Sequence, residues 1–191
     1  MTRVVGAVLA AGSGTRMGRP KAEIVLDGER LLDRAVRALT AAGCEPVLAV
    51  VRAGTAVAGA RPVVNPDPER GQRSSLALAV DAAGDADALA VVLVDTPGIG
   101  PDAIAAVTAA WRPGRIAVAR YAATDGPRRG HPTVMSPALW RRALELAGPD
   151  EGAKSLLASH PELVDVVDAP GDPTDLDTPE DVARHRSARE P

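Results

Sequence analysis

The chain has 191 residues, a formal net charge of −3, and an apolar content of 46% with only 2% aromatic residues. This length suits one domain of ordinary size with a substantial core, and the scarcity of aromatic residues leaves Val, Leu, Ile and Ala to fill that core. The negative charge and the few aromatic rings argue against binding to nucleic acid or to an anionic membrane, and the single cysteine excludes an internal disulfide and a cysteine metal cluster.

Apolar segments of strand and helix character alternate along the chain. The first is a short buried run that ends in Ala-Ala-Gly, and the next shows the helical spacing of apolar residues before Gly43. Residues 122–132 are rich in Gly, Pro, Arg and Asp, which indicates a loop or an open hairpin. We expect strands at 4–9, 47–51, 62–64, 88–94, 116–121, 133–135 and 163–167, and helices at 31–42, 74–83, 101–110, 137–147, 152–159 and 179–187.

This alternation predicts an α/β fold. Repeated strand–helix units imply right-handed crossovers and a mostly parallel, twisted sheet with helices on both faces. We therefore expect one Rossmann-like domain with three α/β/α layers over residues 1–191. In such sheets ligands bind beyond the carboxyl ends of the strands, and the polar segments after the first, third and fourth strands fall there.

The loop after the first strand has the composition of a phosphate-binding segment. Its small residues allow a tight turn that presents backbone N–H groups to an anion, and Arg16 and Lys21 add two positive charges. It is neither a P-loop, because Lys21 lies between Pro20 and Ala22, nor a dinucleotide fingerprint, because Gly18 comes one residue late. We expect an NTP to contact Leu9, Ala10, Ala11, Gly12, Ser13, Gly14, Arg16 and Lys21.

The lysines are unusual because there are only two, Lys21 and Lys154, in a chain whose other basic side chains are almost all arginine. A lysine kept where arginine dominates hints that its compact ammonium group matters, although drift in composition explains Lys154 equally well. The N-terminal segment lacks the pattern of a signal peptide and no apolar run approaches the length of a membrane span, so we expect a cytoplasmic location.

Two aspartates are candidate metal ligands. Asp95 follows the strongest apolar run, so its carboxylate is expected to point into the ligand crevice. Mg²⁺ prefers oxygen ligands and is often held by one or two carboxylates together with substrate phosphates. Each has a structural alternative: for Asp95 a helix N-cap or an Asx-turn before Pro97, and for Asp177 the start of a helix at Pro179.

Together these segments resemble the MobA-like NTP transferases, most closely the branch that cytidylylates the molybdenum cofactor. The resemblance implies a nucleotidyltransferase fold, Mg²⁺ as cofactor with Asp95 and Asp177 as its ligands, and catalytic roles for Arg16, Lys21 and Asp95. It assigns nucleotide binding also to Asn65, Gly71, Ser74 and Ser75, and acceptor binding to Gly130, His131 and Pro132. The motifs that carry it, besides the loop at 9–21, are Asn65-Pro66-Asp67, Gly71-Gln72-Arg73-Ser74-Ser75-Leu76, Val94-Asp95-Thr96-Pro97, Gly130-His131-Pro132 and Asp175-Leu176-Asp177-Thr178-Pro179-Glu180-Asp181.

The resemblance implies transfer of a nucleoside monophosphate from an NTP, with CTP favoured, onto a phosphorylated small molecule such as molybdopterin. Use of GTP comes second, and transfer to a sugar phosphate or to phospholactate comes third. Some proteins similar to this branch are described as oxidoreductases of a nicotine-derived pigment, so an NAD(P)H-dependent reductase is an alternative of another class. A non-catalytic nucleotide-binding regulator is a further alternative. The resemblance also implies a possible protein partner, a molybdoenzyme or its chaperone that docks to receive the finished cofactor. The sequence itself is silent on such docking.

Overall fold

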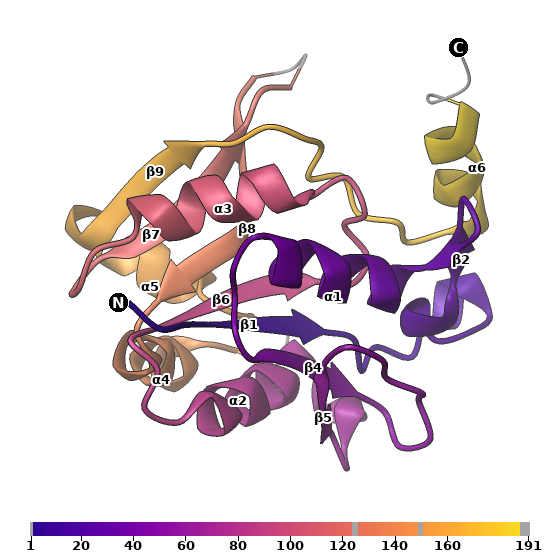
Figure 1. Ribbon diagram of the computed structural model, residues 1–191, viewed down its shortest axis with the longest axis horizontal. Helices are drawn as coiled ribbons and strands as arrows, with labels where there is room; N and C mark the ends of the chain where they lie inside the picture. The colour runs from indigo at the N-terminus through magenta and orange to yellow at the C-terminus, as the bar shows by residue number, and fades with distance from the viewer. Residues whose placement is uncertain (1, 124–125, 149–150, 188–191) are drawn as a thin grey trace.

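A seven-stranded sheet in the order β5-β4-β1-β6-β8-β7-β9 runs through the middle of the computed structural model, which describes residues 2–123, 126–148 and 151–187 (Figure 1). Neighbouring strands are parallel except that β8 is antiparallel to both β6 and β7. A separate hairpin joins β2 (Val25–Leu26) and β3 (Glu29–Arg30). The strands of the main sheet are β1 (Val4–Leu9), β4 (Val47–Val51), β5 (Arg61–Val64), β6 (Ala88–Leu93), β7 (Ile116–Tyr121), β8 (Arg128–Met135) and β9 (Val164–Asp168).

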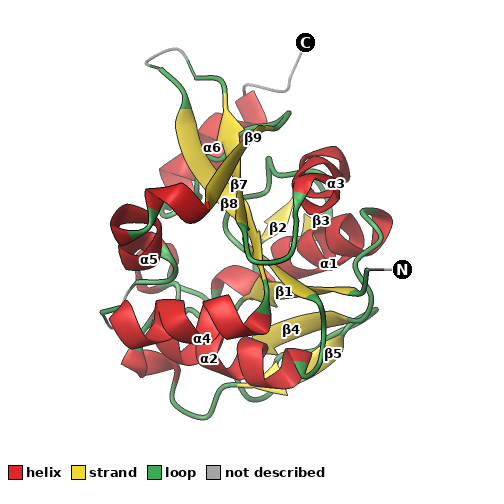
Figure 2. Ribbon diagram, turned by 90° about the vertical axis from the view of Figure 1, so that its left-hand side faces the viewer, coloured by secondary structure: helices red, strands yellow, loops and turns green. Residues whose placement is uncertain are grey.

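Helices cover both faces of the sheet, which gives three layers (Figure 2). On one face lie α1 (Leu31–Ala41) and α3 (Pro101–Ala110). The other face carries α2 (Gln72–Ala83), α4 (Pro137–Leu146) and α5 (Lys154–Ser159). The last helix is α6 (Pro179–Ser187), and short 3-10 turns are η1 (Thr15–Met17), η2 (Lys21–Glu23), η3 (Pro68–Arg70) and η4 (Pro161–Leu163).

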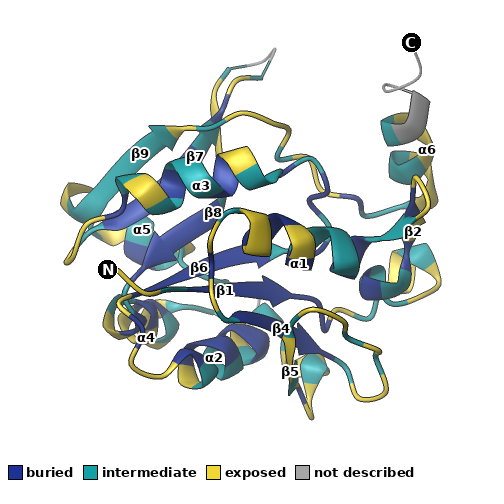
Figure 3. Cartoon of the chain, in the orientation of Figure 1, coloured by how far each residue is buried: buried dark blue, intermediate teal, exposed yellow. Residues whose placement is uncertain are grey.

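The core forms two apolar clusters, one on each face of the sheet. The central strands β1, β4 and β6 are mostly buried between the helical layers (Figure 3). Successive residues of a strand point to opposite faces, so Val8 joins the cluster under α1 and α3 while Ala7 and Leu9 join the one under α2, α4 and α5. Trp111 belongs to the first cluster and Trp140 to the second. Most buried side chains are Val, Leu, Ile or Ala, as the composition predicts.

The predicted α/β fold with a mostly parallel sheet is confirmed, with three local differences. The helix expected to begin at Ser74 begins at Gln72 after Gly71, because Ser74 donates its hydroxyl to the Gly71 carbonyl oxygen instead of capping the helix. The hairpin β2–β3 was not predicted. Its turn residues Asp27 and Gly28 have φ of 53° and 80°, the positive pair that a two-residue hairpin turn requires.

The third difference concerns the return strand expected at 133–135. The strand β8 already begins at Arg128, so Gly130, His131 and Pro132 lie in a strand and not in a loop. Thr133 pairs with Val118 while Gly130 pairs with Ala119, so His131 and Pro132 form a bulge without partners on β7. A bulge accommodates a proline because an unpaired position needs no N–H donor.

Among the described residues, no helix combines the length and the apolar character needed to cross a bilayer.

Candidate functional site

The candidate site lies where the parallel strands β1, β4, β5 and β6 end. The Gly-rich loop follows β1, Arg52 follows β4, Asn65 follows β5, and Asp95 lies just beyond β6. Because the carboxyl ends of parallel strands meet at one edge of a sheet, these segments are brought together there.

The loop after β1 is held in a tight conformation. Gly14 has φ of 61°, and a Cβ atom at this position would lie 2.0 Å from the carbonyl oxygen of Arg19, so only glycine fits. The Arg52 Nη1 atom donates a hydrogen bond of 3.1 Å to the carbonyl oxygen of Ala11, and the same guanidinium pairs with Glu69. Arg52 was not singled out from the sequence, although its position directly after a buried strand is the same signal that identified Asp95.

Beneath this loop is a cavity of about 320 Å³, a size that admits part of a nucleotide. Of the predicted nucleotide-binding residues and metal ligands, it is lined by Leu9, Ala11, Gly12, Ser13, Lys21, Gly71, Ser75 and Asp95. The lining also includes Pro68, Glu69, Gln72, Leu93 and Val94, which the sequence did not single out as site residues.

Several predicted nucleotide-binding residues lie behind or beside this cavity. Ala10 is buried, and Gly14 and Arg16 are not among the lining residues. Asn65 is only 3% exposed, and its amide donates hydrogen bonds of 3.0 and 2.9 Å to the hydroxyl oxygens of Ser74 and Ser75. Asn65 therefore ties the segment after β5 to the first turn of α2, which fixes the position of Ser75 at the cavity wall.

Lys21 joins the two candidate metal ligands in one charged cluster. Its ammonium nitrogen lies 2.6 Å from Asp95 Oδ2 and 2.5 Å from Asp177 Oδ1, and Arg16 Nη2 lies 3.0 Å from Asp177 Oδ2. Burial by itself would lower the pKa of Lys21, but the hydrogen bonds and charges of Asp177 and Asp95 raise it above its usual value. The hydrogen bond from Lys21 in turn lowers the pKa of Asp177, so the Lys21 ammonium group and the Asp177 carboxylate are both charged at neutral pH.

The C-terminal segment brings Asp177 back to the sheet. The backbone N–H of Leu176 donates a hydrogen bond of 2.8 Å to the carbonyl oxygen of Asp95, and the Leu176 side chain is buried. The start of α6 is capped by Thr178 and Asp181, each of whose side chains accepts a hydrogen bond from the other's backbone N–H. Because these two residues supply the cap, the Asp177 carboxylate faces Lys21 and Arg16 instead of serving as the helix start.

The pair of aspartates fits a divalent cation. The Asp95 Oδ1 atom is buried and has no hydrogen-bond partner among the described residues, a costly state for an ionised oxygen. Within the same described ranges, no cluster of three or more His, Cys, Asp or Glu side chains could hold a metal. Two carboxylates that leave the remaining positions to phosphate and water oxygens suit Mg²⁺ or Mn²⁺.

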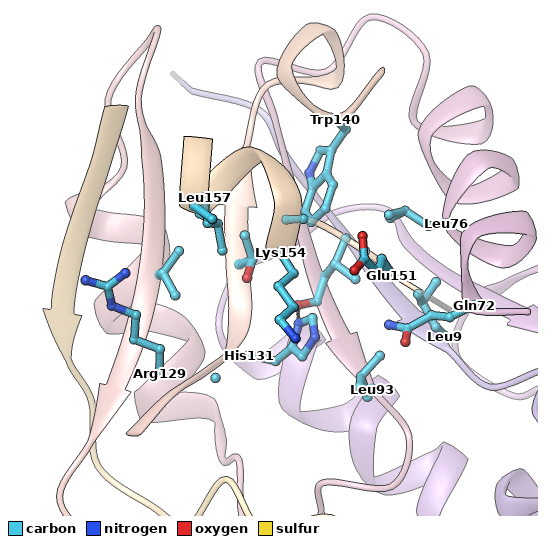
Figure 4. A pocket seen from close by; sticks show the side chains of 17 residues that line it. Leu9, Gln72, Leu76, Leu93, Arg129, His131, Trp140, Glu151, Lys154 and Leu157 are labelled. Atoms are coloured by element: carbon cyan, nitrogen blue, oxygen red, sulfur yellow. Dashed lines mark hydrogen bonds between the residues drawn. The ribbon is translucent and has the colours of Figure 1, made fainter. Parts of the chain in front are cut away.

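A larger cavity of about 570 Å³ adjoins the first and shares Leu9, Gln72 and Leu93 with it (Figure 4). Gly130 and His131 line this cavity, whereas Pro132 is buried and does not. The His131 Nδ1 atom lies 3.0 Å from the carbonyl oxygen of Val91, and Tyr121 donates its hydroxyl to the His131 carbonyl oxygen at 2.5 Å. Burial lowers the pKa of His131, so the ring is neutral at pH 7.

A model of the MobA-like NTP transferase domain matches residues 6–164. Nicotine blue oxidoreductase from Paenarthrobacter nicotinovorans is 36% identical to this chain over 95% of the length of both proteins. A probable molybdenum cofactor guanylyltransferase from Opitutus terrae is 40% identical over 62% of this chain and 61% of its own length.

Solved structures are similar over the whole chain. A Mycobacterium sp. strain JC1 homologue of the Mycobacterium tuberculosis protein Rv0371c superposes with a TM-score of 0.81 at 27% identity, covering 97% of this chain and 96% of its own. A manganese complex of Rv0371c itself gives a TM-score of 0.75 at 27% identity, covering 96% of this chain and 97% of its own.

Proposed function

Because the chain belongs to the MobA-like NTP transferase family, we propose that it transfers a nucleoside monophosphate from an NTP onto a phosphorylated small-molecule acceptor and releases pyrophosphate. The observation that carries this proposal is the cluster of Lys21, Asp95 and Asp177, in which Lys21 and Asp95 line the cavity beside the Gly-rich loop and Asp177 contacts Lys21. A fixed ammonium group can bind a polyphosphate while the two carboxylates beside it bind the cation that accompanies the polyphosphate.

The donor nucleotide is proposed to lie in the smaller cavity. Backbone N–H groups of residues 11–14 would bind its phosphates, and Arg16 and Lys21 would offset negative charge on the α-phosphate and on the departing pyrophosphate. Asp95 and Asp177 would hold a divalent cation, Mg²⁺ in the cell. When bound, that cation neutralises phosphate charge, which is the largest electrostatic obstacle to phosphoryl chemistry.

The acceptor is proposed to lie in the larger cavity, beside Gly130 and His131. One of its phosphate oxygens attacks the α-phosphorus, the bond from that phosphorus to pyrophosphate breaks, and pyrophosphate leaves with the electron pair. The second pKa of a phosphate monoester is about 6, so the attacking oxygen is already ionised and needs no strong general base. The chain then contributes mainly positioning and fixed charges.

We also propose an identity for the acceptor and for the donor nucleotide. We propose molybdopterin as the acceptor, supported by the name of the Opitutus terrae relative. The motifs at 130–132 and 175–181 favour CTP as the donor. GTP is its direct competitor, because that relative is named a guanylyltransferase.

A second candidate function is oxidation or reduction of a nicotine-derived pigment, favoured by the 36% identity to nicotine blue oxidoreductase over nearly the whole chain. The paired aspartates and the buried, unpartnered Asp95 oxygen favour nucleotidyl transfer, because hydride transfer between organic molecules needs no divalent cation.

A thermal-shift panel separates these functions. The protein is heated with CTP, GTP, ATP, UTP or NADPH, each with and without Mg²⁺, and a ligand that binds the native state raises the midpoint. We expect stabilisation by CTP or GTP that depends on Mg²⁺, followed by pyrophosphate release when molybdopterin is added. Stabilisation by NADPH alone, with no pyrophosphate from any NTP, would overturn the proposal.

A further inference from the structure

The two lysines of the chain lie one in each of the two adjoining cavities. Lys21 lines the smaller cavity and forms the charged cluster with the aspartates. Lys154, at the start of α5, lines the larger cavity, and in Figure 4 its side chain points into that cavity toward the His131 ring. The sequence offered no reason to separate Lys154 from compositional drift.

The Lys154 ammonium group is available for a ligand. The residue is exposed, and within the described residues its side chain donates no hydrogen bond. Its acidic neighbour Glu151 is occupied otherwise, since its carboxylate accepts hydrogen bonds of 2.6 Å from the Ser155 hydroxyl and 3.2 Å from the Gly148 N–H. Glu151 therefore organises the turn before α5, and although the Lys154 charge also lowers the pKa of Glu151, no hydrogen bond joins the two side chains.

The rest of the cavity wall indicates what kind of molecule fits. Leu76, Val91, Val118, Trp140 and Leu157 make much of the lining apolar. Trp140 is only 1% exposed and donates its indole N–H to the carbonyl oxygen of Leu89, so this part of the wall is fixed. Such a surface suits a flat or ring-shaped molecule. The charged lining residues are Lys154, Arg129 and Glu151, and because the Glu151 carboxylate accepts hydrogen bonds from Ser155 and Gly148, the two cations are left to suit an anionic group on that molecule.

We propose that Lys154 binds the phosphate of the acceptor, while the apolar wall holds the acceptor's ring system. This inference rests on the proposed function and deepens it, because it names the residue that recognises the acceptor and the class of molecule recognised. A lysine suits this task, since its three rotatable N–H donors can follow a phosphate as it approaches the α-phosphorus. The cavities share Leu9, Gln72 and Leu93, so an acceptor in the larger cavity adjoins the donor site.

The presence of only two lysines makes a direct test feasible. Reductive methylation with ¹³C-formaldehyde keeps the positive charge and gives NMR signals for Lys21, Lys154 and the N-terminal amine alone. Lys154→Arg, which removes one signal, assigns the spectrum. Mg²⁺ with CTP or GTP, molybdopterin, and pyridoxine 5′-phosphate are then titrated separately as probes.

We expect the NTP to move the Lys21 signal, and molybdopterin or pyridoxine 5′-phosphate to move the Lys154 signal. Movement of the Lys154 signal by a phosphorylated ring supports the inference even if no nucleotidyl transfer is found, so the two proposals can fail separately. If neither phosphorylated ring moves the Lys154 signal at millimolar concentration, or if only the NTP does, the inference is wrong.

Kinetics give a second readout where transfer is measurable. Lys154→Met is expected to raise the KM for the acceptor by roughly 10- to 100-fold, the loss typical of one hydrogen bond to a charged group, and to leave the KM for the NTP within about twofold. Lys154→Arg should recover part of the loss. The control is Arg61→Met, which removes an exposed cation on the edge strand β5. An equal change in both KM values for Lys154→Met would contradict acceptor binding.

Discussion

Lys21 holds the carboxylates of Asp95 and Asp177 within 2.6 and 2.5 Å of one ammonium nitrogen. The same two carboxylates are the ones proposed to hold the divalent cation, so Lys21 and the cation compete for their negative charge. Binding of the NTP relieves this competition, because its phosphates offer the ammonium group another anionic partner.

Lys21→Met is therefore expected to have two opposite effects. Transfer should fall by at least roughly 100-fold, the usual loss when one preorganised electrostatic contact to a transition state is removed. Affinity for Mn²⁺ without nucleotide should rise, because no ammonium group competes for Asp95 and Asp177. Pyrophosphate release measures the first effect, and electron paramagnetic resonance of free Mn²⁺ measures the second.

Arg19→Met is the matched control for Lys21→Met, because Arg19 is an exposed cation on the same loop. It should change neither quantity by more than about twofold, as is usual for exposed charges. Weaker Mn²⁺ binding by Lys21→Met would show that the two aspartates are not the metal ligands.

The sequence indicated which residues belong to the site better than it indicated which side chains those residues contact. Lys21 and Asp95 were predicted from their positions after buried strands. The contact between Lys21 and Asp177 joins residues that are 156 positions apart in the chain, and local patterns do not encode such a contact. Asn65 was expected at the nucleotide, yet its amide is used by Ser74 and Ser75, because packing of α2 against the end of β5 decides where the side chain points.

The helix α6 is the element that carries Asp177 into position. Thr178 and Asp181 cap its first turn, and Asp181 also accepts a hydrogen bond of 3.0 Å from the backbone N–H of Asp177. Hydrogen bonds from Thr178 and Asp177 lower the pKa of Asp181 to about 2, so the cap is present at any pH near neutrality.

Thr178→Ala is expected to cost about 1 kcal/mol of stability and to weaken Mg²⁺-dependent NTP binding severalfold, because the loosened cap no longer fixes Asp177. Thr178→Ser keeps the hydroxyl group and should retain both the stability and the Mg²⁺-dependent NTP binding. Urea denaturation and the thermal shift with Mg²⁺ and NTP measure the two effects. Ser136→Ala removes the equivalent cap of α4 and should lower stability without changing the ligand response. If both alanine variants weaken NTP binding equally, the cap acts only through global stability.

Among the elements, the long apolar strands and periodic helices were predictable, whereas the irregular segments were not. The Asp27-Gly28 pair is a hairpin signal in the sequence, but the strands beside it have only two residues each and give no periodicity. The strand β8 contains Gly130 and Pro132, which read as a loop locally. The strand β7 pairs with Arg128, Arg129 and Gly130 and so extends the strand beyond the predicted residues, which shows that tertiary pairing overrides local preference.

For the molecule as a whole, the sheet connects the two apolar clusters. Strand residues alternate between them, so β1 and β6 each contribute side chains to both faces. If one helical layer unfolded alone, the apolar side chains on that face of the strands would be exposed to water, while the other layer still covered the opposite face. We therefore propose that the described residues form a single cooperative domain.

The two tryptophans test this proposal because each reports on one cluster. Trp111, which directly follows α3, belongs to the cluster on the face of α1 and α3, and Trp140 of α4 belongs to the cluster on the opposite face. In Trp111→Phe and Trp140→Phe, the remaining tryptophan reports its own face by fluorescence, while far-ultraviolet circular dichroism reports the whole chain. For each variant the two urea transitions should coincide, as in two-state unfolding. Each comparison is made within one variant, so any destabilisation by the substitution cancels. A fluorescence transition that precedes the dichroism transition in only one variant would mean that this face unfolds on its own, and that the sheet does not couple the two layers.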